Sequence, residues 1–179
     1  MNMDSINIRK ATAADLDEVE KIYNDAHDAI EAGKITTGWM RGIYPTRDSA
    51  AAALERDDLF VLEEDGEILG TGIINQIQVD VYAGAPWEHE ADDDKVCVFH
   101  TLVIRQDAAG KGLGSAFIRY YEDYARKHGW MELRMDTNAL NLPARRLYKH
   151  LGYKEAGIVP TTFNGIPGVQ LVLLEKHLE

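Results

Sequence analysis

The chain has 179 residues, of which 45% are hydrophobic and 27% charged, a composition that excludes a disordered or collagen-like protein. Its 19 basic and 30 acidic residues give a formal net charge of −11, which disfavours nucleic acid and anionic membranes as partners. A single cysteine, Cys97, excludes an internal disulfide framework and a cysteine-rich zinc fold.

The length predicts one domain over residues 1–179, because a chain of this size can bury its own core without disulfides. The lone cysteine fits a reducing compartment, so we expect the cytoplasm. The start, Met1-Asn2-Met3-Asp4, has no basic region followed by an apolar stretch, and no apolar run approaches the ~20 residues of a membrane helix. We therefore expect neither a signal peptide nor a membrane span.

Hydrophobic periodicity in the first half of the chain predicts two helices and three strands. Thr12 can cap the first helix, and Asp65-Gly66 is a hairpin signal between two strands. The predicted elements are a strand at 6–8, a helix from residue 12 to about 33, a loop at 35–45, a helix at 46–56, and strands at 59–62 and 68–79.

The second half continues the alternation of strands and helices. Gly129 and Gly152 end two predicted helices, and Asn141 can cap the second of them. The predicted elements are an acidic loop at 82–95, a buried strand at 96–104, a helix after a glycine cluster, a strand near 133–135, a helix at 141–152, and strands at 154–159 and 169–175 around an Asn164-Gly165 turn. This order predicts an α/β (α+β) fold in which helices flank one mixed sheet.

The strongest local signal is the sequence Gly110-Lys111-Gly112-Leu113-Gly114-Ser115, between a β-branched strand and an amphipathic helix. Glycines let the backbone approach a ligand closely, and a helix start presents free N–H groups that favour phosphate oxygens. The segment does not match a Walker loop. It matches a dinucleotide fingerprint only in part, because Ser115 occupies the third glycine position, and a dinucleotide-dependent oxidoreductase stays as a less favoured alternative.

Residues 104–115, Ile-Arg-Gln-Asp-Ala-Ala-Gly-Lys-Gly-Leu-Gly-Ser, resemble the acetyl-CoA-binding segment of the GCN5-related N-acetyltransferase (GNAT) family. Residues 141–153, Asn-Leu-Pro-Ala-Arg-Arg-Leu-Tyr-Lys-His-Leu-Gly-Tyr, resemble the second motif of that family. With the element order upstream, the resemblance covers nearly the whole chain. It implies a single, mostly antiparallel sheet with splayed central strands, and an enzyme that moves an acetyl group from acetyl-CoA to a primary amine by direct attack.

The resemblance also implies where acetyl-CoA, the co-substrate, would bind. The diphosphate would lie on the turn of Gly110, Lys111, Gly112, Leu113, Gly114 and Ser115, and the pantetheine arm would pair with the backbone of Leu102, Val103 and Ile104, near Asn141. The donor to the thioester carbonyl would be a backbone N–H around Val103. Ala109 departs from the family, which usually has Arg or Gln there, and we expect this to lower the affinity for acetyl-CoA without abolishing binding.

The second motif makes Tyr148 the candidate general acid, because a phenol can give a proton to the departing thiolate. For the general base, the sequence leaves three options open: Asp136 at a strand end, His100 in the central strand, or a water that relays the proton to several carboxylates. Direct attack needs no covalent enzyme intermediate, so Cys97 is not expected to be a nucleophile.

The acceptor would be a small amine, an amino acid or a peptide N-terminus. We expect its site to be built from aromatic residues in loops, which are Trp39, Tyr44, Tyr82, Trp87 and Phe163. Acids beside them would suit a cationic amine. A homodimer agrees with the family, in which dimers are common, and a non-catalytic acyl-CoA-binding module is the second alternative to the enzyme.

One further cluster contains side chains of the type that bind metals. Its members are Glu88, His89, Asp92, Asp93, Asp94, Cys97 and His100. Their spacing matches no recognised zinc motif, so the sequence predicts no metal site.

Overall fold

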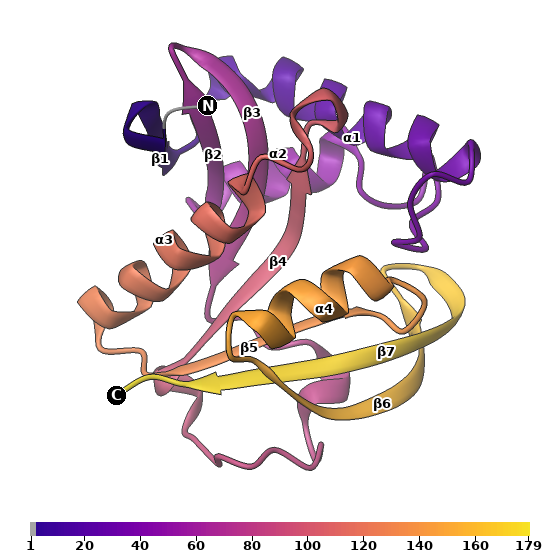
Figure 1. The fold of residues 1–179 in the computed structure, drawn as a ribbon. Coiled ribbons are helices and arrows are strands. Elements are labelled where there is room, and N and C mark those ends of the chain that lie inside the picture. The colour runs from indigo at the N-terminus through magenta and orange to yellow at the C-terminus, as the bar shows by residue number, and fades with distance from the viewer. Residues whose placement is uncertain (1–2) are drawn as a thin grey trace.

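The computed structural model describes residues 3–179, and the first two residues, on which part of the expectation about a leader rests, lie outside that range. Four α-helices and seven strands form the described chain (Figure 1). They are β1 (Ile6–Lys10), α1 (Leu16–Glu31), α2 (Arg47–Glu55), β2 (Leu59–Glu64), β3 (Glu67–Asn75), β4 (Val96–Ile104), α3 (Leu113–His128), β5 (Glu132–Asn138), α4 (Leu142–His150), β6 (Lys154–Phe163) and β7 (Ile166–His177). Within residues 3–179, no helix has the length and apolar character needed to cross a membrane.

The strands form one mixed sheet in the order β1-β2-β3-β4-β5-β7-β6. Every neighbouring pair is antiparallel except β4 and β5, which run parallel. Helix α3 connects β4 to β5. Because these two strands run parallel, the chain must return along this helix to the end of the sheet where β4 began. The expectation of a mixed, mostly antiparallel sheet flanked by helices is confirmed.

The parallel pairing between β4 and β5 is short, and the two strands separate beyond it. Only three residues of β4, Val96 to Val98, pair with β5, although β4 continues for six more residues. Figure 1 shows the two strands in contact at one end and diverging toward the other. The edge of β4 that faces β5 therefore keeps backbone N–H and C=O groups without a strand partner beyond Val98.

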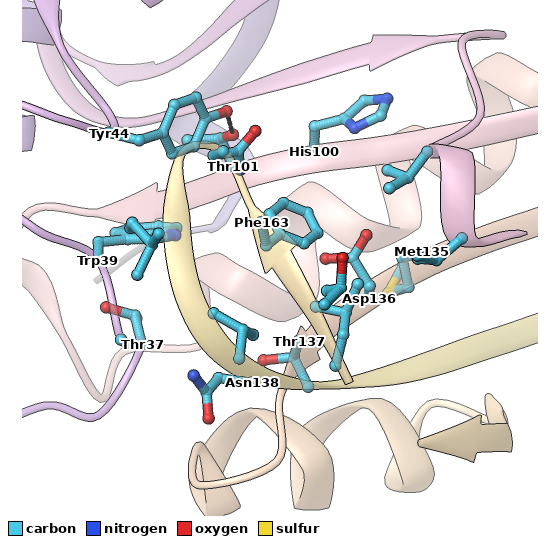
Figure 2. Close-up of a pocket in the computed structure, with 18 of the residues that line it drawn as sticks. Thr37, Trp39, Tyr44, His100, Thr101, Met135, Asp136, Thr137, Asn138 and Phe163 are labelled. Atoms are coloured by element: carbon cyan, nitrogen blue, oxygen red, sulfur yellow. Dashed lines mark hydrogen bonds between the residues drawn. The ribbon is translucent and has the colours of Figure 1, made fainter. Parts of the chain in front are cut away.

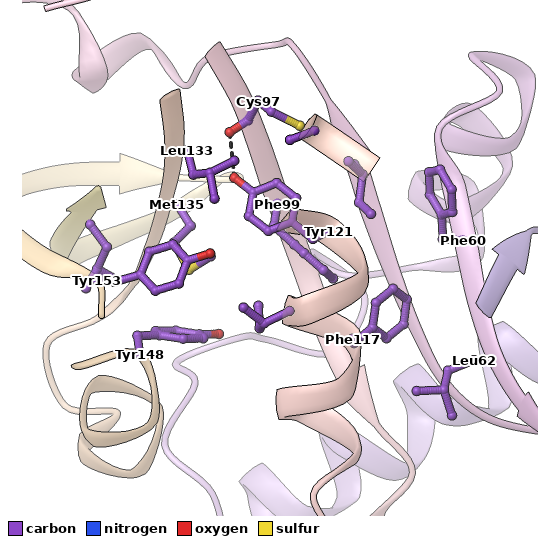
Figure 3. Packing of buried hydrophobic residues seen from close by; sticks show 14 of the residues in the cluster. Phe60, Leu62, Cys97, Phe99, Phe117, Tyr121, Leu133, Met135, Tyr148 and Tyr153 are labelled. Atoms are coloured by element: carbon purple, nitrogen blue, oxygen red, sulfur yellow. Dashed lines mark hydrogen bonds between the residues drawn. The ribbon is translucent and has the colours of Figure 1, made fainter. Parts of the chain in front are cut away.

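Helices cover the sheet on both faces because the strands carry apolar side chains on both. Phe60 and Leu62 of β2 belong to the core under α3 and α4, whereas Leu59 and Val61 of the same strand pack against α1 and α2. Figure 3 shows the first of these clusters, in which Phe117 and Tyr121 of α3 lie against the sheet. A third cluster, around Tyr82, lies between the β5-β7-β6 half of the sheet and the β3–β4 loop.

Local signals placed most element ends correctly. Thr12 and Asp15 form a capping box, but the first turn is a 3₁₀ helix at Ala13–Asp15 and α1 begins at Leu16. Thr46 caps α2, and Gly129 ends α3 in the left-handed conformation with φ of 74°.

Three expected boundaries were wrong. Strand β3 ends at Asn75 rather than residue 79, because the Asn75 side chain accepts a hydrogen bond from the N–H of Ile77 at 2.9 Å and turns the chain. The last two strands extend to the Asn164-Gly165 turn because they pair along almost their whole length. Phe163 is therefore the last residue of β6 and not a loop residue, and Tyr82 lies in a short 3₁₀ helix.

Candidate active site

A cavity of about 460 Å³ lies where β4 and β5 diverge. Its walls come from β4, β5, α4, the loop before α2, the β3–β4 loop and the β6–β7 hairpin, so residues far apart in sequence meet there (Figure 2). Of the predicted site residues, the lining contains Trp39, Tyr44, His100, Leu102, Asp136, Asn141, Tyr148 and Phe163. Sequence positions that only the resemblance connected are thus brought together by the fold.

A β-bulge lies in the cavity wall. Thr71 pairs with Val103 and Ile73 with His100, so two residues of β4, Thr101 and Leu102, oppose the single residue between them on β3. Thr101 has a φ of 53°, an unfavourable region for a β-branched residue, and its hydroxyl shares a short hydrogen bond with Tyr44. The irregular backbone therefore lies at 101–102, whereas Val103, the expected carbonyl donor, pairs with β3.

Asp136 combines a deep position with access to the cavity. Protein surrounds its carboxylate, and burial raises its pKa from 3.8 to about 6. It keeps some accessible surface because it borders the cavity. The Tyr82 hydroxyl donates a hydrogen bond of 2.6 Å to Oδ2, which partly opposes the rise in pKa. A carboxylate with a pKa near 6 can accept a proton at neutral pH and release it again.

Tyr148, on α4, also lines the cavity. Burial and the charge of Asp136 raise its pKa to about 12, so it carries its proton at neutral pH. Among the described residues, no side chain or backbone group forms a hydrogen bond with its hydroxyl. The phenol is therefore free to donate to a group that enters the cavity.

The His100 ring, unlike the Tyr148 hydroxyl, already has a hydrogen-bond partner. Its Nε2 lies 2.8 Å from Oδ1 of Asn75, which accepts a hydrogen bond from it. Burial lowers its pKa to about 4, so the ring is neutral at neutral pH. Cys97 is fully buried and burial raises its pKa to about 12, which keeps it a thiol at neutral pH.

The glycine turn lies at the start of α3. Gly110 and Gly112 have φ values of 78° and 79°, a conformation that favours glycine. A Cβ built on Gly110 would meet no atom within 4 Å, so no side chain fills the space beside it. Lys111 is exposed, whereas the Leu113 side chain belongs to the core and leaves only its backbone for a ligand. Gly114 and Ser115 are half-buried in the first turn of α3, whose leading N–H groups have no acceptor within the helix.

Neighbouring positions have local roles as well. Asn141 caps α4, because its side chain accepts a hydrogen bond from the N–H of Ala144 at 3.4 Å, and it also lines the cavity. Ile104 continues β4 next to Val103 but does not line the cavity. Ala109 is exposed and follows a 3₁₀ turn at Gln106–Ala108.

The aromatic residues divide into two groups. Trp39, Tyr44 and Phe163 line the cavity (Figure 2). Tyr82 is buried behind the wall and reaches Asp136 through its hydroxyl. Trp87 lies outside the cavity, where it packs edge-on against Tyr82 and under the Arg134 guanidinium at 4.2 Å. Trp87 thus supports the loop that carries Tyr82.

Sequence reasoning missed most of the polar lining residues, among them Thr37, Thr101, Thr137 and Asn138. The Thr37 hydroxyl is buried without a hydrogen-bond partner among the described residues, an unfavourable state for a polar group. The neighbouring Gly38 gave a weak signal, because with φ of 78° it lets the loop approach Asn138 closely. Nothing in the local sequence indicated the other two threonines.

Comparison with known proteins agrees with this geometry. A sequence model of the acetyltransferase (GNAT) family matches residues 16–153, which include both motifs and both diverging strands. The chain belongs to the GNAT family. The match ends at Tyr153, so the β6–β7 hairpin, which supplies one wall of the cavity, lies beyond the matched range.

Individual GNAT relatives are distant. An uncharacterised N-acetyltransferase of Methanocaldococcus jannaschii is 26% identical over 156 residues, which are 85% of this chain and 62% of the relative. Streptothricin acetyltransferase of Escherichia coli is 25% identical over 107 residues, 60% of this chain and 58% of the relative. The chain thus spans less than two thirds of the length of these curated relatives.

Solved structures share the fold. A GNAT-family acetyltransferase from Streptococcus agalactiae superimposes with a TM-score of 0.81 at 22% identity, covering 97% of this chain and 96% of the other. A Salmonella typhimurium structure that contains acetyl-CoA has a TM-score of 0.69 at 19% identity, covering 98% and 95%. At these identities the likeness establishes the fold alone.

Proposed function

We propose that this chain is an acetyl-CoA-dependent N-acetyltransferase whose reaction takes place in the cavity between β4 and β5. The observation that carries the proposal is the presence of Asp136 and Tyr148 in one cavity, with pKa values on opposite sides of neutrality. A base that is ionised at neutral pH and an acid that keeps its proton are the two groups that acyl transfer to an amine requires. Family membership supports the same conclusion.

The residues present fit acetyl-CoA. The turn at Gly110 is open, the leading N–H groups of α3 suit a diphosphate, and β4 has a free edge beyond Val98 for an extended arm. Leu102 on that edge lines the cavity, which would place the thioester end of the arm beside the bulge. Bound there, acetyl-CoA would supply the acetyl group, and the carbonyl would accept a hydrogen bond from backbone N–H near Leu102.

Each proton in the transfer has an assigned group. Asp136 takes the proton that the alkylammonium must lose, which leaves the amine free to attack. As the C–N bond forms and the C–S bond breaks, Tyr148 gives its proton to the departing thiolate sulfur. The nitrogen of the new C–N bond then loses its second proton, which returns through solvent to the Tyr148 phenolate and restores the phenol, and Asp136 releases the first proton to solvent. The net products are an amide, coenzyme A as its thiol and one proton. Most of the acceleration comes from holding the amine and thioester in contact within a site that limits water.

The acceptor is a primary amine of a small molecule or of a peptide N-terminus. Polar lining groups include the hydroxyls of Thr37 and Thr137 and the amide of Asn138, and the aromatic wall of Trp39 and Phe163 faces them. Asp136 would pair with the ammonium before deprotonation. A cavity of about 460 Å³ suits a ligand of that size.

The test measures free thiol released from acetyl-CoA with a panel of amines, amino acids and short peptides. Tyr148→Phe should lower kcat by roughly 10²- to 10⁴-fold and leave the affinity for acetyl-CoA unchanged, because only the phenolic hydroxyl is lost. Tyr120→Phe, on the half-buried face of α3, is the matched control and should keep wild-type kcat.

Two results would contradict the proposal. Binding of acetyl-CoA with no thiol release for any amine would make the chain a non-catalytic acyl-CoA-binding module. Binding of a dinucleotide without binding of acetyl-CoA would favour an oxidoreductase. Wild-type kcat in Tyr148→Phe would remove Tyr148 from the mechanism.

A further inference from the structure

Two histidines and a buried glutamate meet at the end of the sheet where β4 and β5 still pair. Glu132 begins β5 and His177 ends β7, and the two residues are paired across the antiparallel strands. His89, from the β3–β4 loop, stacks on His177 with ring centroids 4.6 Å apart. One nitrogen or carboxylate oxygen from each of the three residues lies within 4.8 Å of the others. The sequence could not indicate this cluster, because its members are 43 and 45 positions apart.

We propose that His89, Glu132 and His177 form a binding site for one divalent zinc ion, with water as the fourth ligand. Two imidazoles and one carboxylate are a ligand set that suits Zn²⁺, which prefers four ligands in a tetrahedral arrangement. The expectation that the chain has no metal site rested on spacing along the sequence, and of the side chains weighed then only His89 belongs to this group.

The strongest independent support is the state of the Glu132 carboxylate. Its side chain is 3% exposed, and His177 Nδ1 donates to one oxygen, Oε2, at 2.8 Å. The other oxygen, Oε1, is buried and has no hydrogen-bond partner among the described residues. Burying an unsatisfied carboxylate oxygen is unfavourable, and a cation bound to this carboxylate would offset that cost.

His89 is held in place by its backbone. Its N–H donates to Oε1 of Glu175 at 3.1 Å, and its C=O accepts a hydrogen bond from Nη2 of Arg134 at 3.1 Å. Glu175 and Arg134 are both buried in the sheet. The backbone that carries this imidazole is therefore held in place before any ion binds, which reduces the ordering cost of binding.

The local charge favours a cation. A surface hollow of about 440 Å³ adjoins the cluster, and Glu90 and Asp92 line it together with Lys95. Two buried carboxylates, Glu132 and Glu175, act electrostatically on the single Arg134 guanidinium, so one positive charge offsets only one of the two. The site thus retains negative charge without zinc.

The present geometry needs a small adjustment to bind the ion. Ligand atoms around a tetrahedral zinc at ~2.0–2.1 Å lie ~3.3 Å apart, so the three atoms must approach one another by up to about 1.5 Å. The two rings are nearly parallel, at 16°, and no single ion lies in both ring planes. Both rings would have to rotate about χ2, a broad torsion for histidine, to turn toward one ion, so zinc binding should break the ring stacking.

The site would connect the loop to the sheet at a distance from the catalytic cavity. Glu132 and Asp136 are four residues apart on β5, or about 13 Å along an extended strand. The β3–β4 loop that carries His89 also carries Tyr82, which bonds to Asp136. Figure 1 shows this loop at the end of the sheet near the C-terminus. The bound zinc would therefore stabilise the loop and would take no part in the chemistry.

The test is a calorimetric titration of ZnCl₂ into the full chain, prepared without a histidine tag and freed of metal by chelation. Wild type should bind one equivalent. His89→Ala, His177→Ala and Glu132→Gln should each weaken binding by roughly 10- to 100-fold or more. His150→Ala, at the exposed end of α4 and outside the cluster, is the matched control and should bind as wild type does. Because His89 is exposed in a loop, its substitution also keeps the test valid if another variant fails to fold.

Two spectroscopic readouts distinguish this site from weak surface binding. Saturating zinc should raise the thermal midpoint of wild type and of His150→Ala, but not of His89→Ala. Co²⁺ should give the visible absorption of a tetrahedral ion in wild type but not in His177→Ala. Absence of one-equivalent binding, equal binding by His89→Ala, or an octahedral Co²⁺ spectrum would overturn the proposal, and none of these results depends on acetyl transfer.

Discussion

The Tyr82 hydroxyl donates a 2.6 Å hydrogen bond to the Asp136 carboxylate, across 54 residues of sequence. Tyr82 comes from the β3–β4 loop and Asp136 from β5, and the loop reaches the strand because apolar residues bury it against the sheet. This contact fixes the orientation of the carboxylate that borders the cavity. It also lowers the pKa of Asp136 against the rise that burial causes.

Removing this hydroxyl should move the pH dependence of the reaction. In Tyr82→Phe the ring packing stays, but the carboxylate loses a hydrogen bond that favours its charged form, so its pKa rises further above 6. The acidic limb of the kcat/KM profile should therefore shift to higher pH. Tyr121→Phe removes an equally buried hydroxyl, which donates to the Cys97 carbonyl, and should leave the profile unchanged. Equal profiles for wild type and Tyr82→Phe would contradict the assignment of Asp136 as base.

Replacing Asp136 with asparagine should separate stability from activity. The pKa of Asp136 is about 6 in the folded chain, above the value of 3.8 that applies to the unfolded chain. Asp136 therefore contributes stability that is fully present below pH 3.8 and is lost as pH rises through 6. Asp136→Asn should thus raise the free energy of unfolding at pH 7–8 by up to roughly 3 kcal/mol, an upper limit because cavity water screens the charge. Urea unfolding at pH 4 and pH 8 checks this, since the gain should vanish at the lower pH.

The same variant should lose acetyl transfer, because asparagine can accept the Tyr82 hydrogen bond but cannot take a proton. A fall in kcat/KM of roughly 10²- to 10⁴-fold is the scale of a lost general base. An unchanged rate would show that the carboxylate is not the base. A loss of stability at pH 8 would show that burial does not destabilise its charged form.

The acidic limb of the wild-type kcat/KM profile against pH discriminates between the two candidate bases. Asp136 predicts a midpoint near pH 6, and His100 predicts one near pH 4, because burial shifts the two pKa values in opposite directions. His100→Gln can keep the hydrogen bond to Asn75 and should leave the midpoint near 6. A midpoint near 4 that disappears in His100→Gln would assign the base to the histidine instead.

The glycine turn offers a matched pair of substitutions. Gly110 and Gly129 have φ values of 78° and 74°, and a Cβ on either meets no atom within 4 Å. Alanine at either position should cost about 1 kcal/mol of stability through backbone strain. Only Gly110→Ala should raise the KM for acetyl-CoA, because its methyl group enters the space that the diphosphate would occupy. Equal KM values in the two variants would place the diphosphate elsewhere.

Local sequence was enough to predict most of the fold. Periodicity located the four helices and seven strands of the described residues, and the signals at Thr12, Gly129 and Asn141 lie at element ends in the structure. These features are local because capping and burial patterns act over one or two turns. The end of β3 was wrong because a single side-chain hydrogen bond at Asn75 stops the strand.

The site was predictable only in its parts. Tyr148 and the glycine turn belong to contiguous motifs, so the sequence identified them without a structure. Trp87 was a candidate lining residue because it is aromatic and lies in a loop, but its ring packs on Arg134 outside the cavity. Thr37 and Thr101 became visible only when a loop and a bulge placed them in the wall.

The sequence by itself determined the elements, their order and the two motifs, because each depends on neighbours within a few residues. Only the tertiary structure decided that β4 and β5 separate after Val98, that Tyr82 meets Asp136, and that His89 joins Glu132 and His177. The physical reason is that the end of strand pairing and the packing of a loop depend on the balance of burial over the whole sheet. That balance is a sum over contacts between distant residues, and no short segment contains it.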